Sequence, residues 1–146
     1  MNQIISFGEK MTADEFVRES LTACRGNRSS CNKRELEEIC EKAGVKPVWN
    51  DTKISLYDKI IENHIYTGRE LAKMFHVGVS GRIYVNHFKI SPQTVQKLEK
   101  ANIIHSVGEG DSFACGKRYK ERLYDAYEFE EMDPVTIKEF YMSHRI

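Results

Sequence analysis

The sequence has no long apolar run, no paired-cysteine motif and no excess of either charge. No stretch approaches the ~20 consecutive apolar residues that a membrane-spanning helix requires. Residues 1–8 lack the basic start and the apolar segment of a secretory signal peptide. The protein is therefore expected to be cytoplasmic, without membrane contact and with reduced thiols.

The cysteines form no standard metal site. Cys24, Cys31, Cys40 and Cys115 include no C-x-x-C pair. The first three could bind zinc together with a histidine, but their spacing matches no standard zinc site. Small, buried, apolar-like cysteines are the favoured interpretation. No metal and no cofactor are expected.

Catalytic motifs are also missing. The segment Gly78–Gly81 lacks the last residue of the G-x-S-x-G nucleophile turn. The segment Gly108–Gly110 lacks the rest of a phosphate-binding loop, and its neighbours Glu109 and Asp111 would repel phosphate. The chain is therefore predicted not to be an enzyme.

What is present is a core-forming composition with an uneven charge distribution. The 146 residues are 40% hydrophobic and 30% charged, which suits a small folded domain with an appended part rather than a disordered chain. Residues 66–123 contain ten Lys or Arg and five Asp or Glu, a net charge of +5, whereas residues 124–146 carry −4. The basic middle and the acidic end predict surfaces that prefer different partners.

Hydrophobic periodicity and end signals predict a mainly helical chain. Thr12 or Asp14 can cap the first helix, and Asn32 with Glu35 resembles a capping box at the second. Trp49, in an extended connection at 45–53, is expected to anchor the core. The predicted helices are at about 12–24, 32–43, 54–64, 68–76, 92–101 and 135–144, and the predicted strands are at 65–66, 82–88, 103–107 and 123–129.

The elements from residue 54 onward resemble the winged helix-turn-helix family. Their predicted order is helix, short strand, helix, helix and then strand, loop and strand. Tyr57–His64, Thr67–Phe75 and Gln93–Ile104 look like the three helices of that family, and the loop 108–122 lies in the position of the wing. The resemblance implies a mainly α fold with a small antiparallel β-sheet, an α+β class, and it implies binding to double-stranded DNA.

The resemblance also implies which side chains contact DNA. If Val95 and Leu98 face inward, the polar residues of helix 92–101 face outward, where Gln can read adenine and Lys can reach guanine or phosphate. Basic residues of the wing would contact the DNA backbone. The expected DNA-binding residues are Gln93, Thr94, Gln96, Lys97, Lys100, Lys117, Arg118 and Lys120.

One segment departs from the family pattern, and a second resemblance overlaps the first. The family joins its second and third helices by a few residues, whereas residues 77–90 intervene here with strand-forming composition. Leu36–Val45 followed by Lys53–Ile61 resembles the helix–extended–helix unit of SAP-type DNA-binding motifs. Two ordinary amphipathic helices joined by a loop are the alternative interpretation.

The expected organisation has three parts, and two functions are open. The parts are an N-terminal helical extension of two helices at 1–50, a winged-helix-like domain at 51–132 and a C-terminal helix at 133–146 packed on it. The first hypothesis is a small DNA-binding transcription regulator that acts as a homodimer. The second is a protein-binding adaptor or inhibitor of the kind that phages and mobile elements encode, which would bind a protein partner through the winged-helix-like surface and the insertion 77–90.

Overall fold

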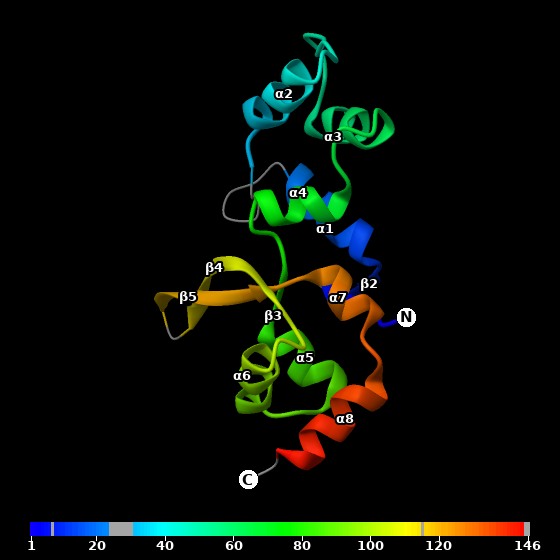
Figure 1. Ribbon diagram of the computed structural model, residues 1–146. Helices are drawn as coiled ribbons and strands as arrows, with labels where there is room; N and C mark the ends of the chain where they lie inside the picture. Colours follow the sequence, from blue (N-terminus) through cyan, green and yellow to red (C-terminus); the bar gives the residue numbers. More distant parts are fainter. Residues whose placement is uncertain (7, 24–30, 115, 145–146) are drawn as a thin grey trace.

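The protein has a mainly helical α+β fold with two small antiparallel sheets, as the sequence predicts (Figure 1). The computed structural model describes residues 1–146 except 7, 24–30, 115 and 145–146, and it leaves the side chains of 111–114 and 118 undescribed. In the described chain the elements are β1 (Ile4–Ser6), β2 (Glu9–Met11), α1 (Ala13–Thr22), α2 (Lys33–Lys42), α3 (Lys53–Glu62), α4 (Gly68–Met74), β3 (Val79–Ser80), α5 (Gly81–Phe88), α6 (Pro92–Lys100), β4 (Ser106–Ala114), β5 (Lys117–Tyr124), α7 (Ala126–Glu131) and α8 (Pro134–Ser143).

Buried apolar side chains form two clusters. The first lies among α1, α2, α3 and α4 and includes Leu36, Leu56 and Leu71. The second joins β1 and β2 to α5, α6, the three-stranded sheet, α7 and α8. Phe16 of α1 and Tyr127 of α7 pack against both clusters. The two ends of the molecule in Figure 1, with α2 and α3 at one and α8 at the other, therefore belong to different clusters.

The six predicted helices are confirmed to within about two residues at each end. Their starts are set by local hydrogen bonds, because a side-chain oxygen of the capping residue satisfies a free backbone N–H in the first turn. In α1, α2, α3 and α4 the third helical residue also accepts from the capping residue, which completes a capping box. These pairs are Thr12 with Glu15, Asn32 with Glu35, Thr52 with Ser55, and Thr67 with Glu70.

The predicted strand at 82–88 is wrong, because Gly81–Phe88 forms helix α5. Its aromatic and β-branched composition favours a strand, but Tyr84 and Phe88 stand four residues apart on one helical face and pack against the second cluster. Lys89 ends the helix in the left-handed conformation, with φ of 57°. Residues 77–90 are therefore not an irregular insertion.

The region after α6 also differs from prediction. The wing loop expected at 108–122 is mostly paired strand, because β4 and β5 form a long antiparallel hairpin with a bulge between Ser106 and Gly108. The strand expected at 123–129 is wrong beyond Tyr124. The Asp125 carboxylate accepts from the backbone N–H groups of Tyr127 and Glu128, so the chain enters α7 there.

Two further differences concern short elements. Residues 65–66 form no strand. The hairpin of β1 and β2 was not predicted, since three-residue strands carry little periodic signal; Gly8, with φ of 78°, lies in its turn. The Asn2 side chain donates to the backbone oxygens of Phe129 and Met132, which fixes this hairpin beside α7.

Candidate nucleic-acid interface

Helices α5 and α6 are joined by only three residues, Lys89 to Ser91. The left-handed Lys89 turns the chain, and buried Ile90 anchors the turn in the second cluster. The Ser91 hydroxyl accepts from the Thr94 backbone N–H, and Pro92 occupies the first helical position, where no N–H is needed. The start of α6 is therefore fixed relative to α5 by packing and by its cap.

The outward face of α6 carries Gln93, Gln96 and Lys100, all of which are exposed. Val95 and Leu98 are buried on the opposite face, as predicted. The expectation that Thr94 faces outward is wrong. Thr94 is 4% exposed, and its hydroxyl lies 2.8 Å from that of Ser91, so it belongs to the helix start rather than to a binding face.

Lys97 lies at the edge of this face and contacts the C-terminal helix. Its Nζ donates to the backbone oxygen of His144 at 2.9 Å. The His144 ring in turn stacks on Phe140 of α8, with ring centroids 4.0 Å apart. The Lys97 ammonium is therefore already bonded to the end of α8. Of the residues predicted in α6, Gln93, Gln96 and Lys100 point outward without such a contact.

The acidic residues nearest this face are paired with arginines. Arg122 of β5 lies 2.8 Å from the Glu99 carboxylate, and the Tyr124 hydroxyl donates to its other oxygen at 2.9 Å. Burial and then the Glu99 carboxylate raise the pKa of Tyr124 to about 12. The neighbouring residue of β5, Glu121, has its carboxylate 3.6 Å from the guanidinium of Arg82 in α5. Neither acid therefore presents an unbalanced negative charge beside α6.

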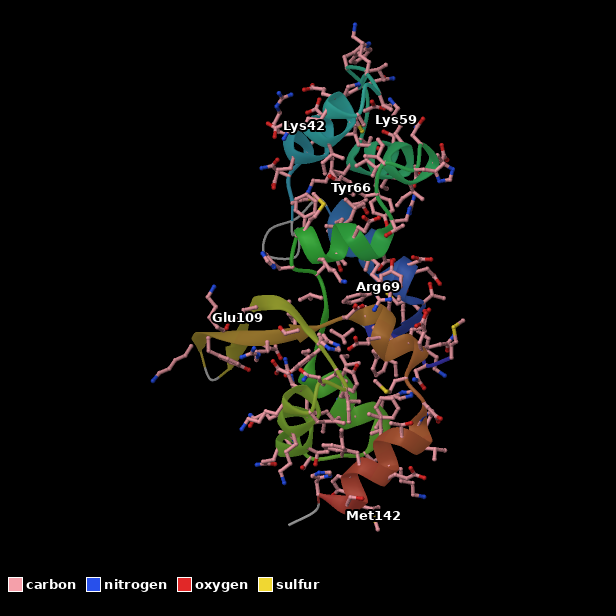
Figure 2. The ribbon with its side chains drawn as sticks, in the orientation of Figure 1. Lys42, Lys59, Tyr66, Arg69, Glu109 and Met142 are labelled. Atoms are coloured by element: carbon pink, nitrogen blue, oxygen red, sulfur yellow. The ribbon has the colours of Figure 1, made fainter. Side chains whose placement is uncertain are left out.

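The β4–β5 hairpin projects from the body of the molecule (Figure 1). Lys117 and Lys120 are exposed on β5, and the side chain of Arg118 lies outside the described residues. Because side chains alternate along a strand, Lys120 stands on the same side of β5 as Arg122, which reaches α6. Glu109, on the hairpin in Figure 2, is paired directly opposite Arg122 in the sheet.

Sequence reasoning did not include three basic residues, Arg82, Lys89 and Arg122, among the expected DNA-binding residues. Arg82 lies in the first turn of α5, Lys89 lies exposed in the turn between α5 and α6, and Arg122 bridges β5 to α6. The positive charge of the segment was visible in the sequence, but the wrong strand at 82–88 hid where Arg82 and Lys89 would stand. The two amides, Gln93 and Gln96, therefore lie on a helix that Arg122 contacts from β5.

A second exposed feature lies at the far end, between α2 and α3. The expectation that Trp49 anchors the core is wrong, since the side chain is 93% exposed. The turn that carries Trp49 is stabilised by hydrogen bonds to the buried side chain of Asp51, which is 7% exposed. Asp51 accepts from the Val48 backbone N–H at 2.8 Å and pairs with Lys59 at 2.7 Å. Trp49 is thus presented on a braced turn.

Bracing by Asp51 predicts a pH dependence. The hydrogen bond from Lys59, followed by that from the Val48 N–H, lowers the pKa of Asp51 below its ordinary value of about 3.9. A carboxylate whose pKa is lower in the folded than in the unfolded state stabilises the fold at any pH above its unfolded-state pKa. This stabilisation is lost as the pH falls through the folded-state pKa. Wild type is therefore expected to unfold at higher temperature than Asp51→Asn at pH 7, with the difference shrinking below about pH 4. Thermal melting followed by far-ultraviolet circular dichroism measures both melting temperatures at each pH. A difference that persists at pH 2 would contradict the assignment.

The described cysteines, Cys31 and Cys40, are buried, as predicted. Burial raises the pKa of Cys31 to about 11 and also raises the pKa of Cys40. Over the part of the chain that the structure describes, no group of three or more His, Cys, Asp or Glu could hold a metal ion. Cys24 and Cys115 lie outside the described residues.

None of the helices in the described ranges is long and apolar enough to cross a membrane. Comparison with family models, with curated proteins and with solved structures finds no match to this chain. Any function must therefore be argued from the geometry of the chain itself.

Proposed function

We propose that the protein is a non-enzymatic regulator that binds double-stranded DNA through the outward face of α6 and the β4–β5 hairpin. The observation that carries the proposal is the element order from α4 onward. It runs helix, short strand, helix, three-residue turn, helix and hairpin, and β3 pairs with β5. This is the order of the winged helix-turn-helix family, but with α4, α5 and α6 as its three helices.

With α4, α5 and α6 as the three helices, the long connection that set this sequence apart from the family pattern is no longer present. The family joins its second and third helices by a few residues, and α5 and α6 are joined by three. Residues 77–90, which looked like an insertion, supply the short strand and the second helix. The helix proposed to enter the major groove is still α6, with its capped start and its outward Gln93 and Gln96.

The chemistry of the face supports a duplex ligand. Gln side chains can bond adenine through two atoms, and each such contact discriminates by about 1–3 kcal/mol. Lys100 and the hairpin lysines would contact phosphates and make the affinity fall steeply with salt. Because Glu99 and Glu121 are paired with arginines, they do not repel the DNA backbone directly.

The test is a triple variant, Gln93→Ala, Gln96→Ala and Lys100→Ala. Duplexes selected from a random pool by the wild type are titrated by fluorescence anisotropy. The triple variant is expected to bind the best site at least tenfold more weakly and to lose its preference over random duplex, because the base contacts are gone. Affinity of the wild type should fall with rising salt.

The matched control removes positive charge elsewhere. Lys33 and Lys42 are exposed on α2, and Figure 2 shows Lys42 at the end of the molecule away from α6. A Lys33→Ala, Lys42→Ala variant is expected to bind the selected site like wild type. If the triple variant keeps its circular dichroism spectrum and still prefers the selected site, α6 does not read the DNA.

A second candidate function, a protein-binding adaptor, is favoured by Trp49. Tryptophan is enriched among residues that dominate binding energy, and a rigid turn lowers the entropy lost on binding. Val48 and Ile54, which are 50% and 46% exposed, extend the apolar surface around it. Absence of any duplex binding at low salt would make this the leading function.

A further inference from the structure

A groove of about 600 Å³ opens among α1, α3 and α4, in the part of the molecule that does not contain α6. This volume lies in the range of sites that accept small ligands or a few side chains. The groove has an apolar and aromatic floor and an acidic rim. Its lining includes Tyr57, Ile61 and Tyr66 for the floor, and Asp14, Glu15, Asp58, Glu62 and Glu70 for the rim.

The floor holds a largely buried tyrosine, Tyr57, that lines the groove. Tyr57 is 4% exposed, and its hydroxyl makes no hydrogen bond to any residue that the structure describes. A hydroxyl that opens into a groove can donate to or accept from a ligand seated there. Burial, followed by the nearby Asp14 carboxylate, raises the pKa of Tyr57 to about 12, so the hydroxyl stays neutral.

The rim is strongly negative for a chain of zero net charge. Its five carboxylates are opposed by one cation, Arg18, which gives the lining a net charge of −4. Arg18 is itself paired with Asp58 at 3.2 Å. The groove therefore repels phosphate and other anions, and its occupant must be cationic.

Two of the carboxylates are held in place before any ligand arrives. Glu15 accepts from the Thr12 backbone N–H at 3.3 Å, and Glu70 accepts from the Thr67 N–H at 3.0 Å. Each of these bonds uses only Oε1. Within the described structure, Oε2 of both residues and the whole Glu62 carboxylate have no hydrogen-bond partner. The rim is thus preorganised, which reduces the ordering cost of binding.

We propose that this groove binds an arginine-bearing segment of a partner polypeptide. The planar guanidinium can stack on a tyrosine ring and bond a carboxylate through two N–H groups, whereas an ammonium can do only part of this. The aliphatic stem of arginine packs on Ile61 and Tyr66. A guanidinium N–H can also donate to the Tyr57 hydroxyl oxygen.

The test uses a blocked peptide, acetyl-Gly-Arg-Gly-Arg-Gly-amide, titrated into the whole protein by calorimetry at low salt. The groove variant is Glu15→Gln, Glu62→Gln and Glu70→Gln. Gln preserves the capping hydrogen bonds while removing three charges, so the helices should remain. The groove variant is expected to bind the peptide at least tenfold more weakly than wild type.

The matched control removes the same charge elsewhere. Glu9, Glu131 and Glu139 are exposed and do not line the groove. The control variant Glu9→Gln, Glu131→Gln and Glu139→Gln is expected to bind the peptide like wild type. Equal weakening in both variants would mean long-range charge alone, and would overturn the proposal. Should the triple groove variant fail to fold, Glu62→Gln alone tests the same point, since Glu62 has no capping role.

Other occupants give distinct results. A peptide with citrulline in place of arginine should not bind, and binding as tight as that of the arginine peptide would overturn the proposal. Spermine that binds more tightly than the peptide would assign the groove to a polyamine instead. Concentration-dependent self-association in sedimentation, lost in the groove variant, would assign it to the basic hairpin of a second copy.

Discussion

Replacing Asp125 by Ala is expected to lower the free energy of unfolding by about 2–5 kcal/mol. Asp125 is 4% exposed and joins α4 to α7. It accepts from two nitrogens of Arg69, at 3.0 and 2.9 Å, and it caps α7 through the Tyr127 N–H. The cap contributes about 0.5–2 kcal/mol and the charge-assisted bonds about 1.5–3 kcal/mol.

Two variants separate these contributions. Asp125→Asn keeps a capping oxygen but loses the charge, so it should cost less than Asp125→Ala. Arg69→Ala removes the ion pair alone, and Figure 2 shows Arg69 on α4 beside the start of α7. Urea unfolding of the single and double variants gives the coupling energy between the two residues. A loss below 1 kcal/mol for Asp125→Ala would contradict the assigned role.

Tyr84 is expected to give effects of opposite sign with Ala and with Phe. The side chain is 0% exposed and lies 5.1 Å from Phe129 and 5.8 Å from Phe88, measured between ring centroids. Tyr84→Ala should lower the free energy of unfolding by about 3–5 kcal/mol, because it leaves a cavity in the second cluster.

Tyr84→Phe should instead raise the free energy of unfolding by about 1 kcal/mol. Among the described side chains the Tyr84 hydroxyl is buried without a hydrogen-bond partner, and burial raises its pKa far above the ordinary value. Removing it deletes an unpaid desolvation cost while the ring contacts remain. Urea denaturation measures both variants. A destabilised Phe variant would show that the hydroxyl has a partner in solution.

Helix positions could be predicted where the signal is local. Asn32 with Glu35, Thr67 and the pair Ser91–Pro92 each mark a helix start within a few residues, and each was found. The stop at Asn102 was also found, with φ of 60°. These signals need no knowledge of the rest of the chain, since capping bonds span three residues.

Elements set by distant packing could not be predicted. The composition of segment 82–88 favours a strand, and the packing of Tyr84 overrides this β-propensity. Leu123–Phe129 alternates like a strand, yet only its first two residues pair in the sheet. The capping potential of Asp125 was the overlooked local signal.

The candidate interface was predicted in part. The outward positions of Gln93, Gln96 and Lys100 follow from helical period alone. The contact of Lys97 with His144 spans 47 residues, and the pair Glu99–Arg122 joins a helix to a strand. Long-range pairs of this kind require the fold, so the sequence could not tell which charges are neutralised. The groove beside Tyr57 was missed for the same reason.

The docking of β1 beside α7 has a consequence for folding during synthesis. The bonds from Asn2 to Phe129 and Met132 close loops of 127 and 130 residues. Since the cluster of α1–α4 is built from residues up to Val77, it can begin to form while the chain is still being translated. The β1–β2 hairpin is made before α7 and must wait for it, so this hairpin is among the last of the described elements to reach its place.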